Sequence, residues 1–264
     1  MRKYLAFYRI SIQNTLTYRG PILLWRVGNL LALLTMAAFW LSAKGGATIG
    51  GYGKSELVTY YIFVMFLQWI IFWNASGYVS QEIKEGEFST RALLKPASYY
   101  WQKFAHELGW HTLSPLYGLT IIAVALFFLK SNLVFRFSPL TFFFLVIAIF
   151  LGAVVCFSLS MCLGLLAFWL TETSQVNSLL WAGLLVLGGQ GIPITFFPDM
   201  FRTVIYILPF RYVFSFPIEI FLGRLALEGI LVAFVIQVLW IGTFVLLYNL
   251  LWKKGVQVYS AYGG

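Results

Sequence analysis

Two stretches of the sequence contain residue types that could do chemistry, and the first is "HELGWH" (106–111). It differs from the zinc-binding pattern H-E-x-x-H by one extra residue. Five residues at about 100° each place His106 and His111 roughly 140° apart around a helix, so their imidazoles cannot bind one metal ion. The sequence has no other histidine, and we find no serine or cysteine nucleophile with a base available to it. It therefore predicts neither a metal site nor an enzyme, and both histidines are expected to anchor a membrane span at the interface.

The second stretch, "GGYGKS" (50–55), looks like the end of a phosphate-binding loop. The full pattern, G-x-x-x-x-G-K-[ST], requires a glycine at position 48, where this chain has Thr48. The pattern also requires a preceding strand and an α/β domain, whereas apolar runs flank this stretch. We therefore interpret it as a loop between spans, and we expect the chain itself to hold no ATP and no other cofactor.

The composition shows which solvent surrounds the elements that position these residues. Hydrophobic residues make up 61% of the 264 residues, and charged residues only 10%. The mean hydropathy is +0.85. Soluble domains are roughly 45–50% apolar, so a soluble fold of this length could not bury so much apolar surface, and lipid must be the solvent. The formal net charge of +9 is best explained by basic residues that orient the spans and attract anionic lipid. It does not indicate binding of nucleic acid, because no basic stripe alternates with aromatic residues outside the apolar runs.

The apolar runs predict an all-α integral membrane protein, organised as a single transmembrane domain over residues 1–264. A bilayer core of about 30 Å requires about 20 apolar residues in a helix. Six stretches qualify as spans, approximately 22–43, 57–79, 108–129, 140–170, 176–197 and 227–252. Before them, residues 1–20 carry Leu5, Tyr8, Ile12 and Leu16 at helical spacing, which indicates an amphipathic helix in the interface. A frayed tail is the alternative for this segment.

The segment 193–224 is too apolar for a solvated loop and is interrupted by Pro193, Pro198, Pro209 and Pro217. Short re-entrant or interfacial helices on the outer side fit it best. Directly before it, "GGQGIP" (188–193) weakens or ends the fifth span. A break at membrane depth is tolerated only where it is buried in protein or lines a wet cavity.

Lysine and arginine set the expected orientation. With a cytoplasmic N-terminus, the inner segments contain eleven of the eighteen basic residues, which predicts both termini in the cytosol. The densest cluster of charge, "EIKEGEFSTRALLKP" (82–96), then lies in the cytoplasmic segment 80–104. Gly86 ends the helix of the second span, and Pro96 ends a short helix over residues 87–94. A tolerant, solvated loop is the alternative for this cluster.

Polar and aromatic residues inside the predicted spans are candidates for a substrate path, because polar groups are costly in lipid. Tyr61, Gln68 and Phe72 fall on one face of the second span, and Asn177, Trp181, Leu184 and Gly188 fall on one face of the fifth. Helix–helix packing, with Gln68 and Asn177 bonded to neighbouring helices, explains the same pattern equally well. Both interpretations remain open at this point.

These features together resemble the permease subunits of type-two ATP-binding-cassette (ABC) exporters, of the small bacterial six-span class. The resemblance covers nearly the whole chain, from "KYLAFYRISIQNTLTYRG" through "EIKEGEFSTRALLKP" to the outer "FFPDMF…LPFRYVFSFPIEIFLG". It implies a coupling segment that docks on a separate ATPase and a path lined by spans two and five. The implied coupling residues are Glu82, Lys84, Glu85, Gly86, Glu87, Phe88, Arg91, Leu94 and Pro96, with Glu172 as a second cytoplasmic contact.

The same resemblance implies the partners and the location. We expect two ABC ATPase subunits, which would hold the ATP and Mg²⁺, and a second permease that is identical or related. The expected location is the bacterial cytoplasmic membrane, and the expected substrate is amphipathic or lipid-like and moves outward. The aromatic content of 19% suits large apolar or cationic aromatic solutes, although packing explains it equally. The alternatives are a self-sufficient secondary carrier or channel and an assembly factor that transports nothing.

Overall fold

The computed structural model describes residues 2–42, 48, 50–129, 133–134, 138–170 and 174–259, and over these residues the chain is helical. This confirms the predicted all-α class for the described part. The elements in chain order are α1 (Arg2–Thr17), α2 (Arg19–Ser42), α3 (Lys54–Ile71), α4 (Ser76–Lys84), the π-helical turn η1 (Ser89–Leu93), α5 (Tyr99–Leu129), α6 (Pro139–Leu165), η3 (Leu166–Phe168), α7 (Ser174–Val186), η4 (Ile194–Phe196), α8 (Asp199–Ile207), η5 (Pro209–Tyr212), α9 (Ser215–Phe221) and α10 (Leu227–Val258).

Four helical stretches in the described part are long and apolar enough to cross a membrane. They are Gly20–Ser42, Lys54–Lys84, Pro139–Phe168 and Leu227–Val258, and Asn177–Val186 forms a shorter apolar helix. The faces of α2 and α10 that point away from the protein carry large apolar side chains such as Leu24, Leu31, Val235 and Leu239. Such faces are stable against lipid and not against water. The chain is therefore a membrane protein, and six crossings remain a prediction.

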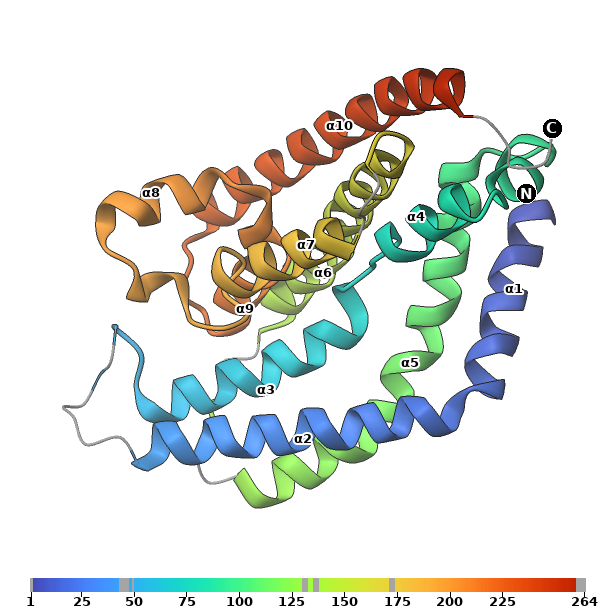
Figure 1. Ribbon diagram of the computed structural model, residues 1–264. Helices are drawn as coiled ribbons and strands as arrows, with labels where there is room; N and C mark the ends of the chain where they lie inside the picture. The colour runs from blue at the N-terminus through green and yellow to red at the C-terminus, as the bar shows by residue number, and fades with distance from the viewer. Residues whose placement is uncertain are drawn as a thin grey trace.

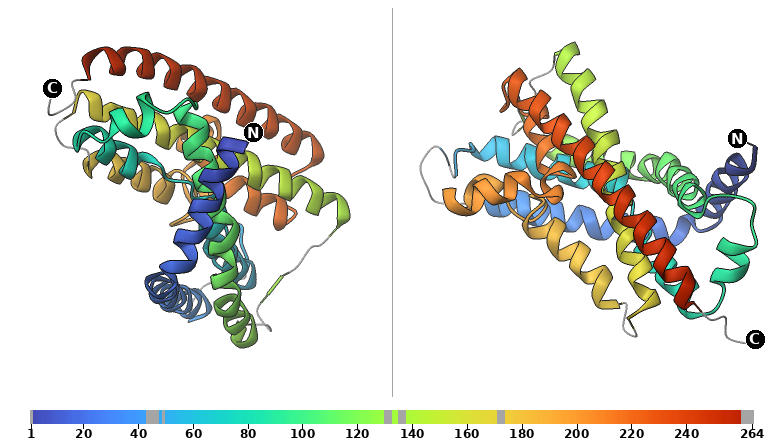
Figure 2. Two further views of the ribbon diagram at one scale, coloured as in Figure 1. Left: turned by 90° about the vertical axis from the view of Figure 1, so that its right-hand side faces the viewer. Right: turned by 90° about the horizontal axis from the view of Figure 1, so that it is seen from above.

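Helices α2, α5 and α6 pack against α3, which together with α4 forms the most buried of the four candidate spans. Helix α2 packs against α3 and α5, α1 lies along α5, and α10 lies along α6 (Figure 1). The views in Figure 2 show α10 on the far side of the molecule from α2. Large aromatic side chains, among them Tyr60, Trp69, Phe157 and Phe216, fill the space between these helices. Helix α3 thus positions its side chains toward several neighbours at once.

The second predicted span, 57–79, consists of two helices in the structure. Helix α3 ends at Ile71, residues 72–75 are not helical, and α4 begins at Ser76. Phe72 has φ −74° and ψ 73°, which is outside helical geometry. Asn74 accepts hydrogen bonds from the Ser76 backbone N–H (3.2 Å) and hydroxyl (2.6 Å), and so holds the first residue of α4, while Ala75 takes the N-cap position without a side-chain bond. The helix therefore stops and restarts inside a stretch long enough to cross the membrane.

The segment 193–224 forms the short elements η4, α8, η5 and α9. Arg211 and Glu219 form a buried ion pair of 2.6 Å in this segment. The Ser215 hydroxyl donates to the other Glu219 carboxylate oxygen (2.7 Å). The Ser215 backbone N–H donates to the Gly188 carbonyl (3.0 Å), which ties the segment to the turn after α7. A buried charge is tolerated when it is paired and hydrogen-bonded. These contacts therefore hold the short helices of residues 193–224 against one another and against the turn after α7.

Candidate functional site

The charged segment, residues 82–96, begins where α4 ends. Gly86 has a φ of +78°, a left-handed conformation that strains residues with a Cβ. The Gly86 carbonyl accepts a hydrogen bond from the Tyr259 hydroxyl (3.0 Å), which comes from the end of α10. The chain then forms η1, in which the Leu94 N–H donates to the Ser89 carbonyl (2.9 Å). Gly86 thus follows the end of α4, and the helix predicted over residues 87–94 is the shorter π-helical turn η1.

Glu82 lies inside the protein, with 6% of its surface exposed. Its carboxylate accepts hydrogen bonds from Lys103 Nζ (2.6 Å) and from the Tyr99 hydroxyl (2.5 Å), and Arg91 Nη1 lies 3.5 Å away. Burial lowers the pKa of the Lys103 ammonium from its ordinary value, although Glu82 acts in the opposite direction. These contacts fix the end of α4 to the start of α5, so Glu82 holds the charged segment in place.

Phe88 is fully buried, with 0% of its surface exposed. Its ring packs against Tyr99, Phe168, Trp252 and Tyr259, with ring centroids 5.1 to 5.4 Å apart. This cage joins the charged segment to α5, to η3 and to the end of α10. Phe88, which the resemblance implied as a coupling residue, is therefore part of the protein core and not of the exposed surface.

The remaining predicted coupling residues lie on the surface of the charged segment. Lys84, Glu85, Glu87, Arg91, Leu94 and Pro96 are exposed. Glu87 and Arg91 form an ion pair of 2.6 Å, and Gln81 donates to Glu85 (2.7 Å). The Leu94 side chain is 76% exposed and adds apolar surface to the outer face of the segment. The structure thus separates two buried supports, Glu82 and Phe88, from an exposed set that could contact another protein.

Three of the predicted path residues, Gln68, Phe72 and Trp181, meet in one groove. The groove has a volume of about 490 Å³ and lies between α2, α3, α5 and α7. The Phe72 and Trp181 rings lie 4.3 Å apart between centroids. Gly118 allows α5 to approach the Trp69 ring at this groove, because a Cβ there would lie 2.0 Å from a ring carbon. Helix α3 and Trp181 of α7 therefore share this groove, whereas Asn177 does not line it.

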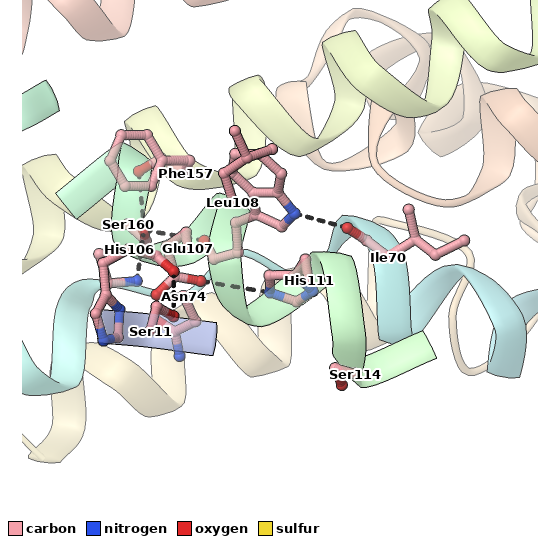
Figure 3. Close-up of polar contacts among 12 residues, drawn as sticks. Ser11, Ile70, Asn74, His106, Glu107, Leu108, His111, Ser114, Phe157 and Ser160 are labelled. Atoms are coloured by element: carbon pink, nitrogen blue, oxygen red, sulfur yellow. Dashed lines mark hydrogen bonds and ion pairs between the residues drawn. The ribbon is translucent and has the colours of Figure 1, made fainter. Parts of the chain in front are cut away.

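Asn177 belongs to a polar cluster at the break between α3 and α4. Its side-chain oxygen accepts hydrogen bonds from Asn74 Nδ2 (2.7 Å) and from the Ser76 hydroxyl (3.0 Å). Ser160 of α6 accepts from the Ala75 N–H (3.0 Å) and donates to the Trp73 carbonyl (3.2 Å). Figure 3 shows Asn74 and Ser160 among these contacts. The break therefore has partners on both α6 and α7, which satisfies backbone groups that a helix would otherwise pair.

The other predicted path residues lie elsewhere. The Tyr61 hydroxyl donates to the Gly191 carbonyl (2.8 Å), Leu184 is fully buried, and Gly188 lies buried in the turn after α7. Tyr61 of α3 thus bonds to the turn after α7, and Gly188 is part of that turn. Neither residue lines the groove. Glu172, the predicted second cytoplasmic contact, lies outside the residues that the structure describes.

Sequence reasoning did not single out Asn74 or the pair Glu107–His111. The carboxylate of Glu107 accepts a hydrogen bond from the Tyr78 hydroxyl (2.5 Å). It also lies 3.4 Å from His111 Nε2, a contact between two residues that Figure 3 labels. His111 also stacks on Trp73, with ring centroids 5.6 Å apart, so it is a core residue and not an interfacial anchor. The four-residue spacing between Glu107 and His111 was the available signal, because side chains at that spacing meet on one face of a helix.

Three further observations bear on the chemistry and the family. Within the ranges that the structure describes, no three His, Cys, Asp or Glu side chains are placed to hold a metal ion. The model of one protein family, described as ABC-2 family transporter protein, matches residues 23–263. A search of curated proteins found no match to the chain.

Proposed function

The chain belongs to the ABC-2 transporter family, and from that premise we propose that it is the permease subunit of an ATP-driven exporter. The family is one of membrane permeases that generally lack a catalytic site and work with an ABC ATPase. In the proposed assembly, two copies of a separate ATPase hold ATP and Mg²⁺. A second permease, identical or related, completes the path in a bacterial cytoplasmic membrane. The substrate is amphipathic or lipid-like.

The observation that carries this proposal is the arrangement of the charged segment. Glu82 and Phe88 fix it to α5, η3 and α10 from inside. The same segment carries Glu85, Glu87 and Arg91 exposed on the surface of the protein. A surface that is both rigidly held and charged can transmit a push from a docked partner, and complementary charges set the register of docking. We assign ATPase coupling to this surface, with Lys84, Leu94 and Pro96 at its edges.

The described ends of the chain support a cytoplasmic position for both termini. Lys3 Nζ donates to the Pro96 carbonyl, and the Ser98 N–H donates to the Tyr4 hydroxyl (3.2 Å). Tyr259 reaches Gly86 from the other end of the chain. Both ends therefore lie beside the charged segment. With α5 and α7 as the two further crossings, the chain would span the membrane six times, with 193–224 on the outer side and Glu172 as a second inner contact.

We place the substrate path in the groove that Gln68, Phe72 and Trp181 line, with Asn177 beside it at the α3–α4 break. Tyr61, Leu184 and Gly188 lie toward the outer turn and would close the path there. The break at 72–75 gives the second span a point at which α3 and α4 can move separately. A movement of the charged segment would reach the groove through α4.

A proton-coupled secondary carrier is the second candidate, and the buried pair Glu107–His111 is the observation that favours it. Ionisable pairs inside a membrane commonly serve proton relays. The two candidates differ in their energy source. Transport in proteoliposomes that requires ATP hydrolysis and persists without a proton gradient supports the exporter, and the reverse supports the carrier.

Reversing two charges on the exposed face of the charged segment is expected to abolish coupling. In Glu85→Lys with Glu87→Lys, the permease should still fold and insert, because both side chains are exposed. Reversed charges would face like charges on the docked partner, which costs on the order of several kcal/mol, so substrate-stimulated ATP hydrolysis by the reconstituted complex should fall by about tenfold or more.

The matched control reverses two exposed carboxylates at the opposite end of the molecule, Asp199→Lys with Glu228→Lys. It changes the net charge equally and should leave stimulation unchanged. Wild-type stimulation in the Glu85/Glu87 variant would mean that this part of the segment is only a solvated loop.

A further inference from the structure

Arg26 places a cation inside the groove, within a stretch of α2 that is apolar enough to cross the membrane. Its guanidinium donates to the Ser114 hydroxyl and to the Ser114 carbonyl (3.4 Å), and it lies 4.4 Å from the centre of the Trp69 ring. Ser114 comes about one turn after His111 on α5 (Figure 3). These partners are neutral, so the charge of Arg26 is held without a counter-ion from them.

Two buried donors at this place lack an acceptor. Arg26 Nε and Trp69 Nε1 are both buried, and neither has a hydrogen-bond partner among the described residues. Both groups can only donate. Buried donors without acceptors are rare and costly in a membrane. Because both atoms are buried, the acceptor oxygens of a ligand in the groove would reach them only after a small shift of the side chains around them.

The lining of the groove favours a negative charge. Its residues are Tyr18, Pro21, Ile22, Arg26, Asn29, Gln68, Trp69, Phe72, Trp110, His111, Ser114 and Trp181, and none carries a carboxylate. The nearby acid, Glu107, is outside this lining and pairs with His111. A cationic solute would therefore be repelled by Arg26 with no carboxylate in the lining to offset the repulsion, whereas an anion would be attracted to Arg26.

We propose that this groove binds the anionic head of an amphipathic substrate, a phosphate or carboxylate with an apolar body. Arg26 and Trp69 Nε1 hold the head, Gln68 and Asn29 offer further amide donors, and the rings of Phe72, Trp110 and Trp181 cover the apolar body. The inference rests on the proposed function, since it names the substrate class of the proposed path. It also selects an anionic head over the cationic aromatic solutes that the composition allowed.

Binding is tested on the whole chain in nanodiscs of phosphatidylcholine, without an ATPase. The ligands are 11-bromoundecyl phosphate and 11-bromoundecyltrimethylammonium, which share a tail whose bromine quenches tryptophan fluorescence on contact. Trp69, Trp110 and Trp181 line the groove. The phosphate should give saturable quenching in the wild type, and the ammonium only the non-saturable quenching of free partitioning. Inorganic phosphate should not displace the bromoalkyl phosphate, because it lacks the apolar body.

Arg26→Gln should weaken binding of the bromoalkyl phosphate by about tenfold or more, as expected for a lost bond to a charged group. Arg26→Lys keeps a cation and should stay within a few-fold of the wild type. Arg9→Gln removes an exposed cation from α1 and should change nothing, which controls for attraction to the surface. Unchanged binding in Arg26→Gln, or equal saturable binding of the ammonium by the wild type, would overturn the proposal.

The comparison of the two head groups uses the wild type alone, so it decides the question even where Arg26→Gln does not fold. It also separates this inference from the proposed function. Saturable, phosphate-selective binding by a chain that recruits no ATPase would contradict only the exporter. An ATP-driven permease that shows no saturable binding of the bromoalkyl phosphate would contradict only the inference.

Discussion

Phe88→Ala is expected to destabilise the permease by about 3–5 kcal/mol, the usual cost of removing a fully buried phenylalanine ring. The ring is enclosed by Tyr99, Phe168, Trp252 and Tyr259, and these side chains come from separate elements that cannot all collapse onto the cavity. The charged segment should then lose its fixed position, so coupling to the ATPase should be lost together with stability. Thermal unfolding in detergent and substrate-stimulated ATP hydrolysis measure the two effects.

Leu94→Ala is the matched control, because it removes an apolar side chain of the same segment that is 76% exposed. It should leave the unfolding temperature within about 2 °C of the wild type, since surface changes usually cost less than about 0.5 kcal/mol. Phe88→Leu should retain most of the stability that alanine loses. If Phe88→Ala unfolds at the wild-type temperature, the aromatic cage does not support the segment.

Glu82→Gln is expected to destabilise the chain by about 3 kcal/mol, because it leaves the buried Lys103 ammonium without its counter-charge. At about 2–4 °C per kcal/mol for chains of this size, the unfolding temperature should fall by roughly 6–12 °C. Lys103 lies 2.6 Å from Glu82, and Tyr99 bonds the same carboxylate. The substitution keeps the size of the side chain and a partner for Tyr99, so the lost charge dominates the effect.

Removing both charges tests the cause. The double variant Glu82→Gln with Lys103→Met should recover at least half of the lost stability, since buried pairs can be replaced together at little cost. Glu85→Gln, which removes an exposed carboxylate from the same segment, should leave the unfolding temperature unchanged. A double variant less stable than the sum of its single changes would mean that the pair is not what holds α4 to α5.

Sequence reasoning identified the membrane class, the family resemblance and the position of the charged segment. These features depend on composition, on hydrophobic runs and on Gly86, whose lack of a Cβ is visible in the sequence. Of the seven path residues that helical spacing grouped on two faces, the structure brings Gln68, Phe72 and Trp181 together in the groove. The lining of the groove does not include Tyr61, Asn177, Leu184 or Gly188, so helical spacing alone did not select the residues that meet.

The break at residues 72–75 could not be predicted in the same way. "FWNA" is apolar except for Asn74 and contains neither glycine nor proline, so it reads as the continuation of a span. Its stability comes from Ser160 and Asn177, which lie far away in the sequence. Tertiary contacts of this kind override local propensity.

The sequence also did not show which apolar residues of the charged segment are buried. Phe88 and Leu94 are both apolar residues of one short stretch, yet one is fully buried and the other is exposed. In a membrane protein an apolar side chain is stable in lipid and in the core alike, so its type does not decide between them. Arg26 is one of the eleven basic residues assigned to the inner segments, because a basic residue near the start of a span usually marks the inner side. Its groove is visible only once α2, α3 and α5 are packed.

The central claim is that this chain works as the membrane subunit of an ATP-driven complex through residues 82–96. The most direct measurement is purification of the tagged chain from its own cells in mild detergent, followed by native mass spectrometry of what accompanies it. The account predicts a separate ATP-binding subunit at one copy per permease, present with the wild type and lost with Glu85→Lys and Glu87→Lys. A permease that purifies without such a subunit, and that transports in proteoliposomes without ATP, would contradict it.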